Sequence, residues 1–293
     1  MHVTVLGCGY VGLELGRQLR DGGHAVLGVR RSADGLAAVR DAGLDAARAD
    51  VTDAASLASL PDTDAVVFAA SAGGRDAAAA RAVYVDGLRT AVEVYGNRAS
   101  PPDRLVYTSS TGVYGDHGGD WVDEDTPLDP ATDRTRALVA AERLAGEAAS
   151  LDATVVRFGG LYGPDRYRLS RYLEGPVTEG YLNLIHRVDA AGVVRHLFET
   201  GATPDTLVAV DDEPVAKADL ARWLASACGV DPPETRSVTE RLAAEDVPDA
   251  RARRLRASKR CANDRLHALG YEFTYPTFRE GYEPAVAAYR DRA

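Results

Sequence analysis

Three glycines near the N-terminus have the spacing and the context of a phosphate-binding turn. Gly7, Gly9 and Gly12 form a G-x-G-x-x-G pattern that directly follows the apolar run from Val3 to Leu6. The first glycine of such a turn permits a tight bend, the second lets a pyrophosphate approach the backbone, and the third lets the next helix pack against the strand. The helix N-terminus offers N–H groups and a positive dipole end to the phosphates. The pattern predicts dinucleotide binding, with contacts from Gly7, Cys8, Gly9, Tyr10, Val11 and Gly12.

Two arginines follow the next predicted strand, Ala25 to Val29, and indicate which dinucleotide binds. An acidic residue in this position holds the ribose 2′-hydroxyl of NAD, whereas an arginine suits the 2′-phosphate of NADP. A guanidinium pairs with phosphate through a planar fork of charge-assisted hydrogen bonds. Arg30 and Arg31 therefore favour NADP, with NAD still open. The alternative is that both are solvated charges at the end of the strand.

The ends of the third and fourth predicted strands are also expected to meet the cofactor. Asp50 and Val51 follow the third strand, in the position where the edges of an adenine ring are met. The alternative for Asp50 is that it caps the helix starting near Asp53. Ala69 and Ala70 end the fourth strand, where small side chains would let a cofactor lie against the strand end.

Strands and helices alternate along most of the chain, which predicts an α/β fold with a doubly wound parallel sheet, the Rossmann fold. Ligands of such sheets bind beyond the carboxyl ends of the strands, where the glycine turn, Arg30, Ala70 and Ser110 all lie. We expect a Rossmann domain at 1–164, which a strand near 205–210 rejoins, and a smaller, partly interleaved C-terminal substrate domain at 165–293. The other predicted elements are strands at 44–47, 64–69, 104–109 and 153–158 and helices at 13–19, 75–98, 132–150 and 214–228, with a last helix from 277.

Composition limits the partners that this chain of 293 residues would take. Its net charge of −10 disfavours nucleic acid, and no apolar run is long enough to span a bilayer. The three cysteines show no C-x-x-C spacing and no histidine is placed as a metal ligand, so we expect reduced thiols, no metal and a cytoplasmic location. The expected partner is a small-molecule substrate, and a homodimer is left open. Only two of the 34 basic residues are lysines, Lys217 and Lys259.

Several segments together resemble the extended short-chain dehydrogenases/reductases, specifically an atypical branch of the NAD-dependent epimerase/dehydratase family. Besides the glycine turn, the segments that carry the resemblance are 109–115 (S-S-T-G-V-Y-G), 157–164 (R-F-G-G-L-Y-G-P), 183–186 (N-L-I-H) and 211–214 (D-D-E-P). The resemblance implies hydride transfer to and from a nicotinamide, with a nucleotide sugar or a related hydroxy or keto compound as substrate. It also implies that Ser110, four residues before Tyr114, holds the reacting oxygen, and that Thr111, Tyr162 and His186 lie on the substrate side.

The chain departs from the family at its acid/base pair. The family places a Y-x-x-x-K motif before an A-x-A-E-like ending, and counting back from Glu142 puts Arg134 at the tyrosine and Leu138 at the lysine. The tyrosine phenol normally acts as acid and base with its pKa lowered by the lysine. Arg134 can stabilise an oxyanion but stays protonated, so Tyr114 and Tyr162 remain as the candidate phenols. The predicted catalytic residues are Ser110, Tyr114 and Arg134.

Two functions are compatible with these residues. The first is a NADP-dependent oxidoreductase or epimerase that uses Ser110 with a substitute acid/base group, and the second is a cofactor-binding redox sensor or regulatory protein with little turnover. His186 has the alternative of being a satisfied histidine at a strand end. The basic run from Arg251 to Arg256, with Lys259 and Arg260, is expected to be solvated beside nearby acids; its alternative is contact with a phosphate-bearing substrate.

Overall fold

The computed structural model describes residues 1–73, 76–148, 151–244, 247 and 249–292. The chain forms two compact units, each assembled from separate stretches. The first unit consists of Met1–Val113, Asp133–Arg157 and Ala190–Leu207, and the second of Tyr114–Thr132, Phe158–Asp189 and Val208–Ala293. The second unit therefore includes residues 114–132, which lie within the range expected for the first domain.

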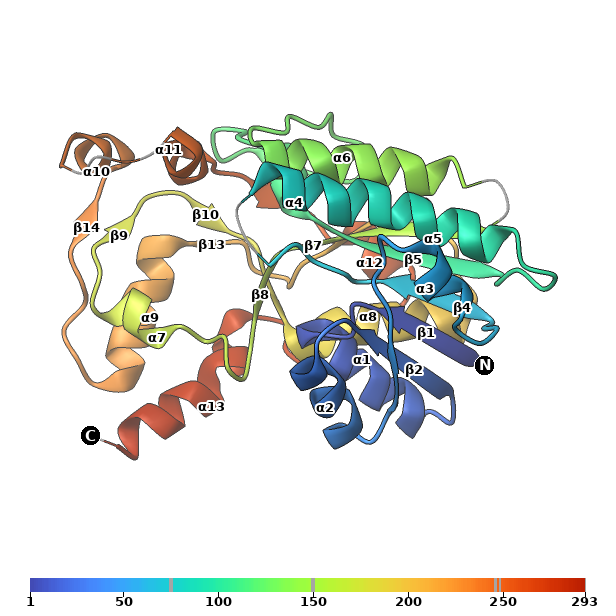
Figure 1. Ribbon diagram of the computed structural model, residues 1–293. Coiled ribbons are helices and arrows are strands. Elements are labelled where there is room, and N and C mark those ends of the chain that lie inside the picture. Colours follow the sequence, from blue (N-terminus) through green and yellow to red (C-terminus); the bar gives the residue numbers. More distant parts are fainter. Residues whose placement is uncertain (74–75, 149–150, 245–246, 248, 293) are drawn as a thin grey trace. The chain divides into compact units, whose positions relative to one another are not determined.

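A seven-stranded parallel sheet, most of it in the first unit, has the strand order β12-β7-β5-β4-β1-β2-β3 (Figure 1). The chain first runs outward from β1 to β3 and then builds the other half from β4 to β12. The strand order thus reverses between β1 and β4, and the predicted doubly wound Rossmann fold is confirmed. The strands are β1 (His2–Leu6), β2 (Ala25–Arg30), β3 (Asp45–Arg48), β4 (Ala65–Phe68), β5 (Arg104–Ser110), β7 (Asp152–Phe158) and β12 (Thr206–Ala209).

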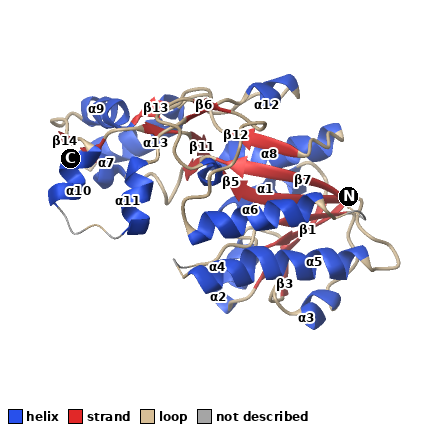
Figure 2. Ribbon diagram, turned by 90° about the horizontal axis from the view of Figure 1, so that it is seen from above, coloured by secondary structure: helices blue, strands red, loops and turns tan. Residues whose placement is uncertain are grey.

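Helices cover both faces of this sheet, so its central strands are buried on both sides (Figures 1 and 2). Helices α4, α5 and α6 lie on one face, and α1, α2 and α8 on the other. All four residues of β4 are buried, which explains why its sequence is continuously apolar rather than alternating. The helices of this part are α1 (Tyr10–Asp21), α2 (Ala33–Asp41), α3 (Ala54–Ala58), α4 (Ala77–Arg81), α5 (Gly87–Gly96), α6 (Asp133–Gly146) and α8 (Arg187–Thr200).

Two predicted helices differ from the observed ones. The helix expected at 75–98 contains a π-helical turn, Ala82–Asp86, between α4 and α5. The helix expected at 214–228 begins only at Lys217, because Val215 and Ala216 pair with Leu182 and Tyr181 as a short antiparallel ladder. Long-range pairing therefore overrides the local helical pattern at that helix start.

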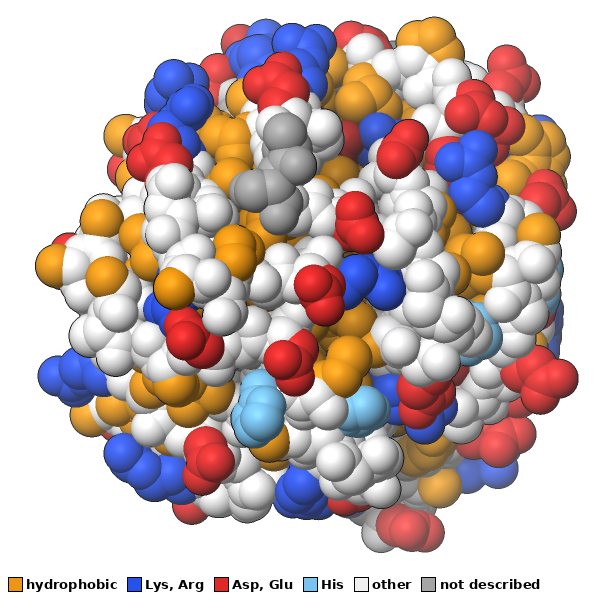
Figure 3. Space-filling model, turned by 90° about the vertical axis from the view of Figure 1, so that its right-hand side faces the viewer, with side chains coloured by type: hydrophobic (Ala, Val, Ile, Leu, Met, Phe, Trp, Pro, Cys, Tyr) orange, Lys and Arg blue, Asp and Glu red, His pale blue; other side chains and the backbone are white. Residues whose placement is uncertain are grey.

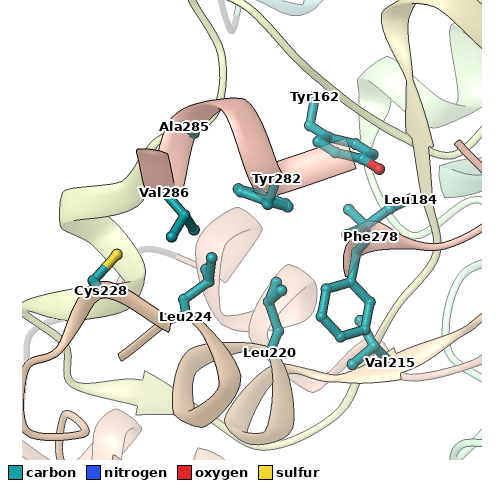
Figure 4. Close-up of a cluster of buried hydrophobic side chains, with 10 residues drawn as sticks. All are labelled: Tyr162, Leu184, Val215, Leu220, Leu224, Cys228, Phe278, Tyr282, Ala285 and Val286. Carbon is teal, nitrogen blue, oxygen red and sulfur yellow. The ribbon is translucent and has the colours of Figure 1, made fainter. Parts of the chain in front are cut away.

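Among the described residues of the second unit, strands form four two-stranded ladders, and α9 and α13 supply most of one buried hydrophobic cluster. Side chains of these two helices pack with Tyr162, Leu184 and Val215 (Figure 4). Its ladders pair β8 (Gly160–Tyr162) with β11 (Leu184–His186), β9 (Val177–Thr178) with β14 (Thr235–Arg236), β10 (Tyr181–Leu182) with β13 (Val215–Ala216), and β6 (Trp121–Val122) with β15 (Arg260–Cys261). Its helices are α7 (Leu169–Leu173), α9 (Lys217–Cys228), α10 (Val238–Ala244), α11 (Asp249–Arg256), α12 (Asp264–Ala268) and α13 (Phe278–Arg290).

Charged side chains of both signs are interspersed on the face shown in Figure 3. The three cysteines are free and buried. No helix in the described part of the chain is both long and apolar enough to cross a membrane.

Candidate functional site

The glycine turn joins the end of β1 to the start of α1 and has the backbone geometry that its spacing predicts. Gly7 has φ of 82°, and a Cβ there would lie 2.3 Å from Cα of Ala70, so only glycine fits against the end of β4. A Cβ at Gly12 would lie 3.0 Å from a methyl of Val5, where α1 packs on β1. Gly9 occupies the N-cap of α1, and no side chain caps that helix.

Arg30 and Arg31 lie in different surroundings. Nη1 of Arg30 lies 2.7 Å from the point where Gly9 would carry a Cβ, so this guanidinium folds back over the glycine turn. Arg31 is exposed instead and pairs with Asp50 at 3.4 Å. The end of β2 therefore places one arginine, Arg30, directly beside the predicted phosphate position.

Asp50 and Val51 are held by local contacts. Asp50 accepts hydrogen bonds from the N–H and the hydroxyl of Thr52, at 3.0 and 2.8 Å, and these bonds lower the pKa of its carboxyl group. The alternative that Asp50 caps α3 is wrong, because Asp53 accepts the capping bond from the N–H of Ala55. Val51 is buried, and a Cβ added to Gly87 would lie 2.8 Å from its methyl group.

Three more predicted cofactor contacts, Cys8, Ala69 and Ala70, lie at the sheet edge beside the turn. Cys8 is buried, and desolvation raises the pKa of its thiol to about 12, so it is a neutral packing residue. Ala69 and Ala70 follow β4, and the N–H of Ala69 donates to the carbonyl of Leu6. This bond ties the end of β4 to the end of β1 at the point where the glycine turn begins.

Ser110 is the last residue of β5 and is half-buried, and its hydroxyl accepts a hydrogen bond from the N–H of Gly112 at 3.1 Å. A Cβ at Gly112 would lie 3.4 Å from that hydroxyl and 3.5 Å from a methyl of Thr135. Thr135 is thus an α6 side chain that approaches the Ser110 turn. Thr111 is buried and begins the 3-10 turn that ends at Tyr114.

One face of α6 carries the residues that replace the family's pair. Arg134 is exposed, and its guanidinium lies 5.4 Å from the centre of the Tyr84 ring in a cation–π contact. Leu138, one turn later, is buried in the core. A lysine in place of Leu138 would have to bury its ammonium.

A buried ion pair lies one further turn along α6. Glu142 contacts Arg157 of β7 at 2.9 Å and accepts a hydrogen bond from Ser109 of β5 at 2.5 Å, and both charged side chains are less than a tenth exposed. The sequence interpretation missed this group. The available signal was an arginine within an otherwise apolar strand, since a buried charge requires a partner.

Tyr162 and His186 lie side by side in the second unit, because parallel β8 and β11 pair these residues in register. Their rings meet edge to face with centroids 5.2 Å apart. Burial, with the nearby Asp211 as a smaller contribution, raises the pKa of the Tyr162 phenol above its ordinary value. Burial lowers the pKa of His186 to about 4, so both groups are neutral at pH 7.

His186 is only partly satisfied. Its Nδ1 accepts the N–H of Val188 at 3.3 Å, whereas Nε2 has no partner among the described residues. Tyr114, the third aromatic candidate, is fully buried. The predicted catalytic and substrate-side residues are therefore divided between the units. Ser110, Thr111 and Arg134 belong to the first, and Tyr114, Tyr162 and His186 to the second.

A cleft of about 530 Å³ lies within the second unit. Its lining includes Trp121 and several acids, and among them Asp211 is buried with neither carboxylate oxygen hydrogen-bonded within the described structure. Burial raises the pKa of Asp211 well above its ordinary value. Asp212 accepts a hydrogen bond from Asn263 at 2.7 Å and contacts His267 at 2.6 Å. Carboxylates and amides of this kind suit hydroxyl donors better than phosphates.

The fold and the glycine turn together define a doubly wound protein of the dinucleotide-binding class. Comparison with known families narrows this class: residues 3–201 match the model of the NAD dependent epimerase/dehydratase family. The chain belongs to this family, and the predicted resemblance is confirmed. Membership makes a nicotinamide dinucleotide the expected class of cofactor.

Similar proteins cover nearly the whole chain. Protein YeeZ of Escherichia coli (strain K12) is 27% identical over 282 residues, which are 94% of this chain and 96% of that protein. A solved structure from Methylobacillus flagellatus, assigned to the NAD-dependent epimerases/dehydratases, is 32% identical with a TM-score of 0.78 and covers 99% of this chain and 98% of its own. A conserved protein of unknown function from Silicibacter pomeroyi is 26% identical with a TM-score of 0.80, covering 98% of both chains.

Proposed function

We propose that this protein is a NADP(H)-dependent oxidoreductase or epimerase acting on a hydroxyl- or keto-bearing small molecule such as a sugar nucleotide. The observation that carries the proposal is the Arg30 guanidinium beside Gly9, within the glycine turn of a family that uses nicotinamide dinucleotides. A 2′-phosphate near this turn would meet a planar cation that forms no ion pair with any carboxylate in the described ranges. NADP is therefore favoured over NAD.

The residues around Ser110 indicate how the chain would handle the substrate. The cofactor supplies hydride transfer when it is bound, and the half-buried Ser110 hydroxyl at the end of β5 holds the reacting oxygen. Arg134 supplies a fixed positive charge that can stabilise a developing oxyanion. Taken by itself, the acidic cleft within the second unit would suit a ligand with several hydroxyl groups.

The residues at the family's acid/base positions are poorly suited to proton transfer. Leu138 brings no charge to lower a phenol pKa, and burial raises the pKa of Tyr162. General acid–base help is worth a factor of about 10² to 10⁴, so turnover of common nucleotide sugars should be slow. The same observations favour a second candidate function, a cofactor-binding sensor with little turnover.

The test is to mix the protein with NADPH, or with NADP⁺ for the reverse direction, and a panel of sugar nucleotides, hydroxy compounds and keto compounds. Nicotinamide absorbance reports any turnover. We expect slow turnover that Ser110→Ala reduces at least about tenfold, because one positioning hydrogen bond is lost.

Ser109→Ala is the matched control, because Ser109 bonds to Glu142 rather than to the Ser110 turn. It should lower stability but leave the rate per folded molecule close to that of the parent. NADPH binding with no turnover across the panel would favour the sensor, and fast turnover unchanged by Ser110→Ala would refute the assigned site.

A further inference from the structure

Both lysines of this arginine-rich chain lie in the same part of the second unit. Lys217 is the first residue of α9, and Lys259 directly precedes β15. The sequence interpretation expected Lys259 to be solvated, but its side chain is only 8% exposed, and Lys217 is half-buried. Two compact ammonium groups are thus partly withdrawn from water in a chain that otherwise uses arginine.

Within the described ranges, each ammonium donates to one backbone carbonyl. Lys217 Nζ donates to the carbonyl of Glu179 at 3.0 Å, and Lys259 Nζ donates to the carbonyl of Gly115 at 2.9 Å. Neither lysine forms an ion pair with a carboxylate in the part of the chain that the structure describes. Because an ammonium carries three N–H donors, each lysine has capacity for further acceptors.

Asp116 is the acid that attracts Lys259 electrostatically, but its carboxylate is already engaged. Oδ1 of Asp116 accepts hydrogen bonds from the N–H of Ser258 at 2.9 Å and from the N–H of Gly118 at 3.1 Å. Asp116 therefore holds the local backbone in place, and its charge offsets part of the charge of Lys259 without forming an ion pair with it.

The side chains of Lys217 and Ser258 both lie beside Gly180. A Cβ at this residue, which has φ of 100°, would lie 3.2 Å from Lys217 Nζ and 3.3 Å from the Ser258 hydroxyl. The N–H of Tyr181 donates to that hydroxyl, and the N–H of Gly119 donates to the carbonyl of Ser258. These contacts hold Lys217 beside Ser258, and Lys259 is the next residue of the chain, with its ammonium on the carbonyl of Gly115.

Several positive groups lie near Lys217. Lys217 stands at the N-terminus of the 12-residue helix α9, which has no side-chain cap, although a cation is disfavoured at the positive end of a helix dipole. Asp219 in the first turn is paired with Arg222 at 2.7 Å. Burial, then repulsion from Arg171 and from Lys259, lowers the pKa of Lys217. Asp116 offsets part of the charge of Lys259, but no carboxylate in the described ranges forms an ion pair with either lysine.

We propose that Lys217 and Lys259, with Ser258 and the N-terminus of α9, form a binding site for a phosphate-class anion. Two ammonium groups and a helix dipole match a doubly charged tetrahedral anion, which offers oxygen acceptors to the remaining N–H donors. The anion is either free phosphate or a phosphoryl group on a small organic molecule. The site rests on residues of the second unit alone and is independent of the proposed oxidoreductase activity.

The experiment is calorimetric titration of the full chain with inorganic phosphate at pH 7 and low ionic strength. We expect saturable binding by the parent that Lys217→Gln and Lys259→Gln each weaken at least about tenfold, since each removes a charge-assisted contact. Arg222→Gln removes an exposed cation from the same helix and should leave phosphate affinity within about twofold. Arg30→Asp should also leave it unchanged, which separates this site from the glycine turn.

A second measurement needs only the parent protein. Phosphate should raise Tm, whereas potassium chloride at the same ionic strength should not, because binding to the folded state stabilises it. Glucose 6-phosphate identifies the source of the anion: at least tenfold tighter binding than inorganic phosphate indicates an organic phosphate, and equal affinity indicates the free ion. Phosphate affinity unchanged in both lysine variants, or equal effects of phosphate and chloride on Tm, would overturn the proposal.

Discussion

Arg30 and Arg31 show how two adjacent, identical side chains acquire different roles. Arg30 lies over Gly9, whereas Arg31 points to Asp50 and remains exposed. Successive side chains of a strand point to opposite faces, so only one of two neighbouring arginines can reach the turn. Both arginines were expected to contact a 2′-phosphate; with this geometry, we expect the contact from Arg30 alone.

Replacing Arg30 by aspartate should abolish or reverse a preference for NADPH over NADH. A charge-assisted contact is worth about 1.5–3 kcal/mol, so the ratio of the two dissociation constants should change roughly 10- to 150-fold. Fluorescence titration with both cofactors measures this ratio. Arg31→Ala is the control and should change it by less than about threefold. Equal dissociation constants for the two cofactors in the parent protein would contradict the assignment.

At the scale of the element, two glycines of the β1–turn–α1 segment have different roles: Gly7 is needed for folding, and Gly9 is expected to be needed for cofactor binding. Gly7 is enclosed by the backbone of Ala70 and has a left-handed φ, so its lack of a side chain is needed for folding. The three heavy atoms nearest to a Cβ at Gly9 belong to the flexible end of Arg30 and to the carbonyl of Gly7, the latter at 3.6 Å. A side chain at Gly9 can therefore displace Arg30 without disturbing the sheet.

Gly9→Val should abolish dinucleotide binding while the protein stays folded, because the branched side chain occupies the space of the pyrophosphate. Calorimetric titration with NADPH measures the binding, and thermal unfolding should show a Tm close to that of the parent. Gly7→Val, its partner variant, should lose both binding and stability. Parental affinity in folded Gly9→Val would show that the turn is only structural.

Helix α6 is a second element in which the place of a side chain along the helix determines whether it is exposed, buried or paired. Arg134, Leu138 and Glu142 follow one another at intervals of four residues and so share a face. The middle position is buried among apolar groups, and the last is neutralised by Arg157. Leu138 and Glu142 thus stabilise the core, and Arg134 is the exposed member of the three, packed over the Tyr84 ring.

At the scale of the whole molecule, stability should depend on pH through His186. Its pKa is lowered from 6.5 to about 4, mainly by burial. The unfolded chain therefore takes up a proton first as the pH falls below about 6.5, and folding free energy is lost progressively down to about pH 4. With 1.36 kcal/mol for each pKa unit, the full loss is about 3 kcal/mol.

His186→Gln should remove this part of the acid sensitivity, since glutamine can accept the Val188 hydrogen bond but does not titrate in this range. Urea unfolding of parent and variant at pH 7, 5.5 and 4 gives the comparison. The pKa values of Asp189 and Asp211 are raised by burial, so these acids act in the opposite direction, but they are present in both proteins and cancel. A parent–variant difference that does not change with pH would contradict a buried, neutral His186.

The sequence by itself determined the features that depend on local spacing. Local sequence patterns of a few residues indicate the glycine turn, the buried strands and the alternation of strands and helices. These features together predicted the Rossmann fold. Counting along α6 was also enough to find Arg134 and Leu138 in place of the tyrosine and lysine.

Only the tertiary structure decided which distant residues meet. Four of the contacts described above join segments that are far apart in sequence. They are Arg30 over Gly9, Glu142 with Arg157, Tyr162 beside His186, and Lys217 near Ser258. These contacts depend on strand order, on ladder register and on glycines with positive φ, each a property of the assembled chain rather than of a local pattern. The composition shows that the chain has only two lysines, but only the folded structure shows that the two interact electrostatically.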